Sequence, residues 1–137
     1  MHSILVKDYM DRNTCAILIT SNIKDAVEAM LRGGVIGMPV IDQEKKLVGY
    51  ISEQDCMKEM LNDTFYCAES PSITKVMSSE VLSVTPDTSI LEIAESMLDR
   101  RPKNYPVVSE GKLIGIINRS HVLKALLENN KDCYSHK

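Results

Sequence analysis

The chain of 137 residues is poor in aromatic side chains, with no Trp, one Phe and five Tyr. Its core must therefore be aliphatic, built from Ile, Leu, Val and the eight Met. No apolar run approaches the roughly 18 residues of a membrane span. The first residues also lack the charged and apolar regions of a signal peptide. We therefore expect a cytoplasmic protein that has no membrane partner.

Two further absences narrow the class of protein. The four cysteines show no close-paired spacing, so we expect reduced thiols. Cys133 and His136 offer only two metal ligands, and we expect no metal site. The 16 Lys and Arg are outnumbered by 19 Asp and Glu, and they form no dominant basic block. Because nucleic-acid binding depends on neutralising phosphates, the composition argues against a nucleic-acid partner.

The chain contains an internal repeat. A shift of 67 residues, which becomes 66 when one residue is removed near Glu44, aligns its two halves. Because the matches follow one another in order, chance similarity is a poor explanation. We expect one repeat at 1–62, a linker at 63–71, a second repeat at 72–130 and a flexible tail at 131–137. The aligned pairs include Met10 and Met77, Ile23 and Ile90, Met30 and Met97, Pro39 and Pro106, Gly49 and Gly115, and Ile51 and Ile117.

Both halves show the same order of predicted elements. Apolar residues at helical spacing predict helices at 23–31 and 90–98. Gly33-Gly34 ends the first helix, and Pro102 bounds the second. The second helix begins with the spacing of a capping box, Ser89 followed by Glu92.

Two short apolar runs separated by a turn follow each of these helices, which predicts an antiparallel hairpin. A further helix comes after each hairpin, and a short extended segment precedes the first helix at 14–19 and at 81–85. Each half is thus a βαββα unit. We expect an α+β fold of two such repeats that pack together with pseudo-twofold symmetry.

Short motifs in these elements resemble the cystathionine β-synthase (CBS) domain. Residues 6–10 and 73–77 are similar to its opening V-x-D-x-M, 38–42 to its L-P-V-V-D strand, and 49–55 to its ending, G followed by two hydrophobic residues and S/T-x-x-D. The resemblance implies a tandem CBS pair, a module that commonly dimerises. It also implies an adenine nucleotide (AMP, ADP or ATP) or S-adenosylmethionine as regulatory ligand, bound in a cleft between the repeats.

The resemblance assigns the most specific ligand-binding roles to Ser52 and Asp55. It places the Asp55 carboxylate on the ribose hydroxyls and Ser52 near the phosphates, beside the free N–H groups of a helix start. An alternative interpretation is structural, because a serine followed three residues later by an acid caps a helix in any protein. Both roles can hold at once.

The second copy departs from this motif, with Asn118 where Ser or Thr is usual and His121 in place of the ribose-binding Asp. An imidazole cannot offer the two acceptor atoms of a carboxylate. We therefore expect the two sites to differ, with one ligand bound per chain. Lys103 and Arg119 are basic residues that could serve the phosphates of a ligand held by Asp55, or could be ordinary solvated charges.

An apolar slot for the adenine ring is expected from the extended segments that precede and follow the first helix of each copy. These residues could equally be ordinary core, an alternative that the sequence leaves open. The candidates are Thr14, Cys15, Gly37, Met38 and Pro39 in the first copy, and Val81, Leu82, Tyr105 and Pro106 in the second.

The function expected from these observations is that of a freestanding regulatory module. It binds an adenosyl ligand, signals occupancy to an unknown protein effector and forms a homodimer. The alternative is a ligand-independent interaction or dimerisation module with degenerate clefts. An enzyme is not expected, because no Ser or Cys stands beside a base and an orienting acid and no Gly-rich phosphate loop is present.

Overall fold

The computed structural model describes residues 4–62, 70–99 and 104–130. They form two compact units, which we name for their place in the sequence. The central unit is Cys15–Val81, and the terminal unit combines Met1–Thr14 with Leu82–Lys137. The predicted linker at 63–71 falls mostly outside the described residues, and the predicted tail at 131–137 and Pro102 lie wholly outside them.

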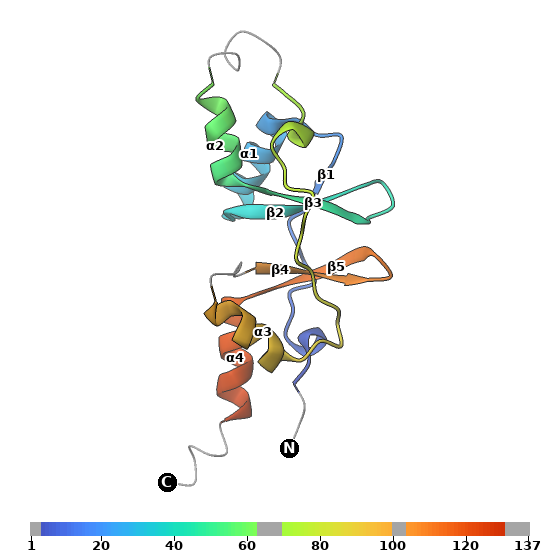
Figure 1. The fold of residues 1–137 in the computed structure, drawn as a ribbon, viewed down its shortest axis with the longest axis vertical. Helices are drawn as coiled ribbons and strands as arrows, with labels where there is room; N and C mark the ends of the chain where they lie inside the picture. The colour runs from blue at the N-terminus through green and yellow to red at the C-terminus, as the bar shows by residue number, and fades with distance from the viewer. Residues whose placement is uncertain (1–3, 63–69, 100–103, 131–137) are drawn as a thin grey trace. The chain divides into compact units, whose positions relative to one another are not determined.

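The central unit is a three-stranded sheet covered on one face by two helices (Figure 1). The order across the sheet is β1-β2-β3, with β1 parallel to β2 and β2 antiparallel to β3, so the predicted hairpin is confirmed. Its elements are β1 (Ile17–Leu18), α1 (Ile23–Gly33), β2 (Gly37–Ile41), β3 (Leu47–Ser52) and α2 (Glu53–Met60).

The ends of α1 follow from local chemistry. Asn22 and Asp25 form a reciprocal capping box, in which the Asn22 side chain accepts from Asp25 N–H at 2.8 Å and the Asp25 side chain accepts from Asn22 N–H at 3.3 Å. Gly34 ends the helix with a φ of 63°, a left-handed conformation that favours glycine. The predicted end of this helix is therefore confirmed.

The terminal unit has the same hairpin and helix pair. The hairpin of β4 and β5 is antiparallel, as predicted, and α3 and α4 lie on one side of it (Figure 1). Ser89 caps α3 by accepting a hydrogen bond from Leu91 N–H at 3.2 Å. This single bond, to the residue before Glu92, replaces the expected capping box of Ser89 and Glu92. The elements are α3 (Ile90–Leu98), β4 (Asn104–Ser109), β5 (Lys112–Asn118) and α4 (Arg119–Asn129).

The extended segment predicted at 81–85 forms a single parallel bridge, Val84 to Val107, where the central unit has the strand β1. In the central unit Ile19 N–H donates to Ile41 O at 2.9 Å and continues the pairing. The equivalent residue of the second copy, 67 positions later, is Pro86. Because proline has no N–H, this bond cannot form and the strand stops after one bridge.

Each unit contains the opening segment of the other repeat. In the central unit, Ser78 and Tyr50 exchange two backbone hydrogen bonds, both 2.9 Å long. In the terminal unit, Asp11 and Ile116 do the same at 2.8 and 2.9 Å. The repeats are therefore contiguous in sequence, whereas the compact units are not. The repeat boundaries at 1–62 and 72–130 stay a prediction about the sequence.

Two glycines allow these opening segments to approach the hairpins. A Cβ added at Gly49 would lie 2.8 Å from Ser78 O, and one added at Gly115 would lie 2.8 Å from Asp11 O. Real Cβ atoms do not come this close to a backbone oxygen. Glycine is therefore required in both units for the same close approach.

Side-chain contacts also join each opening segment to the last helix of its unit. In the central unit, Lys75 Nζ lies 2.8 Å from Glu59 Oε1, and the Glu59 side chain is only 11% exposed. In the terminal unit, the Tyr9 hydroxyl donates to Glu128 Oε2 at 2.7 Å. This bond raises the pKa of Tyr9, because the phenol must lose the shared proton to ionise.

The core of each unit lies between its hairpin and its helices, and it is aliphatic, as the composition predicts. In the central unit the fully buried side chains include Ile23, Met38, Ile51 and Ile73. The terminal core uses Ile90, Val107 and Ile117 in the same way.

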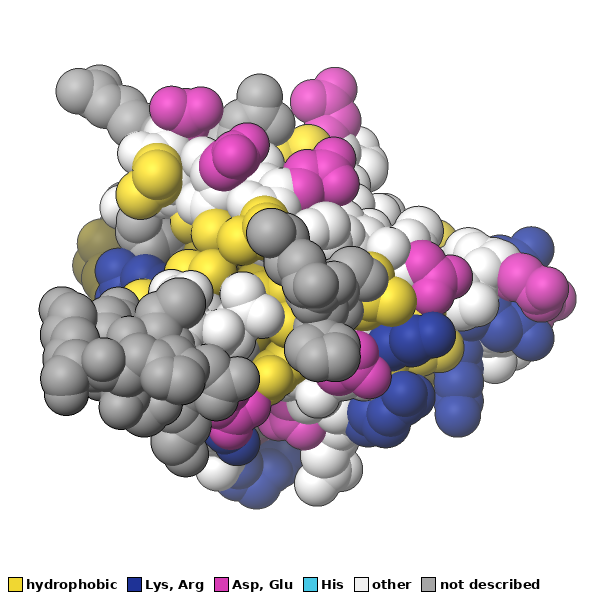
Figure 2. Space-filling view, turned by 90° about the horizontal axis from the view of Figure 1, so that it is seen from below, with side chains coloured by type: hydrophobic (Ala, Val, Ile, Leu, Met, Phe, Trp, Pro, Cys, Tyr) yellow, Lys and Arg dark blue, Asp and Glu magenta, His cyan; other side chains and the backbone are white. Residues whose placement is uncertain are grey.

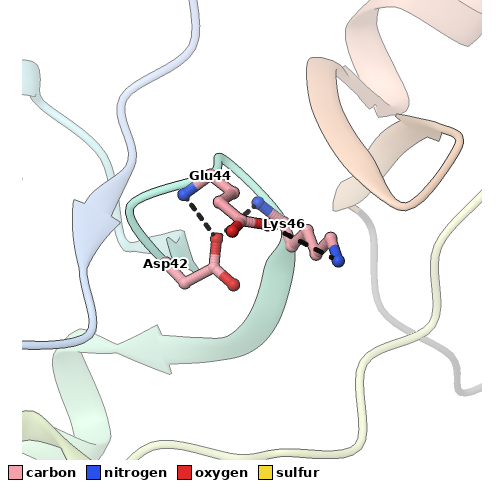
Figure 3. A network of polar contacts seen from close by, with 3 residues as sticks. All are labelled: Asp42, Glu44 and Lys46. Atoms are coloured by element: carbon pink, nitrogen blue, oxygen red, sulfur yellow. Dashed lines mark hydrogen bonds and ion pairs between the residues drawn. The ribbon is translucent and has the colours of Figure 1, made fainter.

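The turn between β2 and β3 is organised by one carboxylate (Figure 3). Asp42 Oδ1 accepts from Glu44 N–H at 2.8 Å and from Lys46 N–H at 2.9 Å, while Lys46 Nζ lies 3.6 Å from Glu44 Oε2. Lys45 takes a φ of 66° within this turn. The turn thereby sets the hairpin register that leads β3 into α2.

Candidate ligand site

The start of α2 brings Ser52 and Asp55 together, directly after β3. Ser52 Oγ accepts from Asp55 N–H at 3.1 Å, and Asp55 Oδ2 accepts from Ser52 N–H at 3.2 Å. The structural interpretation of this motif is thus confirmed, because the two residues form a capping box. The box uses one carboxylate oxygen of Asp55. Among the described residues, no hydrogen bond is found to the other oxygen, Oδ1.

The register of the hairpin sets which side chains share a face with Ser52. Gly37 is opposite Ser52, and Pro39 is opposite Tyr50, so these four residues lie on the sheet face away from the helices. Met38 is opposite Ile51, and their side chains point to the other face. The register therefore separates the predicted site residues into two groups.

Tyr50 is a member of this face that the sequence reasoning missed. Its ring packs over Gly37, where an added Cβ would lie 2.8 Å from both Cε1 and the hydroxyl oxygen. Burial raises the pKa of Tyr50, so its hydroxyl stays protonated and can donate. Its spacing of two residues before Ser52 on a strand could have revealed it.

Met38 belongs to the core through its side chain, and the partly buried Cys15 packs against the same core. Met38 is 0% exposed, and Cys15 Sγ lies 3.7 Å from Met38 Sδ. A ligand could meet Met38 only through its backbone, so for this side chain the core alternative holds. Thr14 is half-buried and is the last residue of its segment in the terminal unit, whereas Cys15 begins the central unit.

The second copy builds the same cap from different atoms. Asn118 Oδ1 accepts from His121 N–H, and His121 Nδ1 accepts from Asn118 N–H, both at 3.1 Å. An imidazole nitrogen that accepts carries no proton, so the proton of the neutral ring lies on Nε2. His121 therefore preserves the helix cap but replaces a carboxylate oxygen with an N–H donor.

The remaining predicted residues of the second copy differ in their exposure. Tyr105 is 4% exposed and belongs to the terminal core, and Pro106 is fully buried opposite Ile116. Arg119 is exposed in the first turn of α4. Val81 is half-buried and Leu82 is 48% exposed, and they lie on either side of the boundary between the units. Lys103 lies outside the described residues.

Cys56 follows Asp55 and is 1% exposed. Burial, with a smaller contribution from the Asp55 carboxylate, raises the pKa of the Cys56 thiol to about 11. The thiol is therefore protonated at neutral pH and is a poor nucleophile.

Other kinds of site find no support in the part of the chain that the structure describes. Within it, no three His, Cys, Asp or Glu side chains gather as a metal site would require. Cys133 and His136 lie outside that part. No described helix combines the length and the apolar composition needed to cross a bilayer.

Comparison with known proteins identifies the repeat. The family model of the CBS domain matches the chain twice, at residues 6–62 and 73–128. A solved structure, CBSX2 of Arabidopsis thaliana in complex with AMP, is 29% identical to this chain. It matches with a TM-score of 0.79 over 92% of this chain and 98% of the other. These similarities confirm the tandem repeat and the α+β fold class.

Two further relatives show the range of proteins that share this fold. A CBS domain-containing protein of unknown function from Bacillus anthracis matches at a TM-score of 0.81 with 25% identity, over 91% of this chain and 94% of the other. The uncharacterized protein MJ1225 of Methanocaldococcus jannaschii is 29% identical over 88% of this chain. The chain spans 42%, 23% and 63% of the length of three curated relatives that it matches.

Proposed function

The chain belongs to the CBS-domain family as a tandem pair, and from this premise we propose that it is a regulatory module for an adenosyl ligand. The ligand is an adenine nucleotide or a relative such as S-adenosylmethionine, held where β3 runs into α2. The observation that carries the proposal is the Asp55 carboxylate, which uses Oδ2 for the cap and keeps Oδ1 for a ligand. The relative CBSX2 has been crystallised with AMP.

The chemistry of this position suits a nucleoside. A carboxylate oxygen can accept hydrogen bonds from ribose hydroxyls, and such charge-assisted bonds are stronger than neutral ones. The first turn of α2 presents the positive end of the helix dipole to a phosphate. Tyr50 shares the sheet face with Ser52, and its half-buried ring offers apolar surface for a base. Pro39 lies on the same face but is fully buried. The Tyr50 hydroxyl adds a donor at the edge of that surface.

Occupancy reaches a partner through α2. The first turn of the helix contains Asp55 at the ligand position, and Glu59 further along the helix forms an ion pair with Lys75 of the opening segment. A ligand that binds one arrangement of this helix more tightly than another shifts the population toward it. The partner is a protein that distinguishes the two arrangements.

Titration calorimetry with AMP tests the proposal, with guanosine monophosphate as the control for base recognition. We expect one AMP per chain, because only the central unit has a carboxylate at this position. S-adenosylmethionine, ADP and ATP, titrated in the same way, rank the adenosyl ligands. The absence of both binding heat and thermal stabilisation with all four ligands at millimolar concentration would refute the ligand role.

A second function, homodimerisation, is favoured by a separate observation. A groove between α1 and α2 is lined by apolar side chains and by Glu53, and it lies open to solvent. Exposed apolar surface of this kind is found at interaction sites more often than elsewhere on a protein surface. We therefore propose that the chain also forms a homodimer through its helices, which light scattering tests. A chain that binds no adenosyl ligand but dimerises would be the ligand-independent module.

A further inference from the structure

The start of α4 differs from the starts of α1 and α2 in the atom that accepts the backbone hydrogen bond of the cap. His121 Nδ1 accepts from Asn118 N–H, and Asn118 Oδ1 accepts from His121 N–H, both at 3.1 Å. At the starts of α1 and α2 the same acceptor position is taken by a carboxylate oxygen, of Asp25 and of Asp55. The cap of α4 therefore depends on an imidazole nitrogen.

An imidazole can serve as this acceptor only while its ring is neutral. A proton taken up from water binds at Nδ1, and the charged ring then carries an N–H group on both nitrogens and has no acceptor left. Asn118 N–H loses its partner, and a positive charge stands in the first turn of a helix, where the helix dipole disfavours it. Because both effects act in the same direction, protonation of His121 loosens the start of α4.

The surroundings of His121 leave its ring in reach of water and of the cap. The residue is half-buried, and the elements that pack against α4 are α3, β5 and the opening segment at 4–12. Among the described residues, the hydrogen bonds of His121 are the two bonds of the cap, and it forms no ion pair. The charged and titratable side chains on these elements, on β4 and on α4 itself are Glu92, Glu95, Asp99, Lys112, Lys7, Asp8, Tyr9, Asp11, Arg12, Tyr105, Arg119, Lys124 and Glu128.

A pH range can be chosen in which these other groups keep their charge. Figure 2 shows Lys and Arg as well as Asp and Glu side chains exposed on one face of the molecule, so charges of both signs surround the fold. Carboxylates ordinarily take up protons below about pH 5, and Lys, Arg and Tyr ordinarily lose them above about pH 9. Between about pH 7.5 and about pH 5.5, a histidine is the side chain whose charge changes. His121 is the one histidine among the residues that the structure describes.

From the geometry of this cap we infer that the start of α4 is a proton-sensitive switch, formed at neutral pH and opened in mild acid. The proton acts on the helix whose Glu128 accepts from Tyr9 of the opening segment, so it changes the terminal unit. The start of α2 does not respond over this range, because its cap uses the carboxylate of Asp55. The switch needs no adenosyl ligand and is therefore an input separate from the ligand proposed above.

Amide hydrogen exchange followed by NMR tests the switch at about pH 7.5 and about pH 5.5, with each rate corrected for the intrinsic pH dependence of exchange. We expect the protection of Asn118 N–H to fall by about tenfold in mild acid. Ser52 N–H, which donates to Asp55, is the internal control and should change by less than about twofold. His121→Gln offers a neutral acceptor at the same position and should remove the pH dependence at Asn118. His121→Lys, a cation without an acceptor, should lower the protection at both pH values.

Three results would overturn the switch. The first is unchanged protection of Asn118 in the wild type, which would show that the start of α4 tolerates the charged ring. The second is a loss of protection that persists in His121→Gln, which would assign the pH effect to another group. The third is a ring that nitrogen chemical shifts show to be still neutral at about pH 5.5. None of these measurements uses AMP, so the ligand proposal stands or fails independently.

Discussion

Replacing Asp55 by Asn separates its two roles, because the amide oxygen can still accept from Ser52 N–H while the charge is lost. The cap therefore survives in Asp55→Asn, and only the favourable interaction of a carboxylate with the helix start disappears. This loss costs about 0.3–1 kcal/mol of unfolding free energy. If Asp55 Oδ1 also accepts from a ribose, removing the charge weakens bonds worth about 1.5–3 kcal/mol. We then expect the affinity for AMP to fall by about ten- to a hundredfold.

The chain contains a matched control for this substitution. Asp25 stands at the same position of the capping box that starts α1, where it accepts from Asn22 N–H at 3.3 Å. Asp25→Asn should therefore lower stability by a similar amount and leave the affinity for AMP unchanged. Calorimetric titration with AMP and thermal unfolding without ligand, performed on both variants, compare the two roles directly. An Asp55→Asn variant that loses stability like Asp25→Asn but binds AMP within twofold of wild type would show that Asp55 is only a cap.

Three further predictions address the second copy, the buried thiol and the close backbone contacts. His121→Asp restores a carboxylate at the start of α4 and should raise the AMP stoichiometry from one to two per chain; two equal sites in the wild type would contradict this reasoning. The Cys56 thiol, with its pKa raised to about 11, should react with iodoacetamide far more slowly than a free cysteine at pH 7 and speed up as pH rises. The raised pKa also means that the folded state binds the thiol proton more tightly than the unfolded state. The unfolding free energy should therefore fall as the pH rises from the ordinary thiol pKa to about 11, and no change over this pH range would argue against burial of the thiol. Gly49→Ala and Gly115→Ala should each lower the unfolding free energy by about 1–3 kcal/mol in a denaturation assay, because the new Cβ meets a backbone oxygen at 2.8 Å. Gly33→Ala, whose new Cβ has its nearest neighbour at 3.4 Å, should be tolerated in the same assay.

The candidate site was only partly predictable from the sequence. Ser52 and Asp55 could be found because their spacing of three residues is a local motif, and a helix start requires the same spacing. The side-chain directions of Met38 and Tyr50 could not, because they depend on which residues face each other across the hairpin. The register between β2 and β3 places Met38 in the core and Tyr50 over Gly37. A one-residue slip would have reversed that assignment.

What the sequence by itself determined is the local part of this protein: two repeats, their hairpins, and helices that begin at capping residues and, in α1, end at Gly34. These features depend on periodicity and on bonds between residues three or four apart, which the sequence displays directly. Only the tertiary structure decided that each opening segment joins the unit of the other repeat, through pairs such as Ser78 with Tyr50. Either unit could in principle accept either segment, because the repeats are similar. The choice depends on packing and hydrogen bonding between residues distant in the chain, which local patterns do not record.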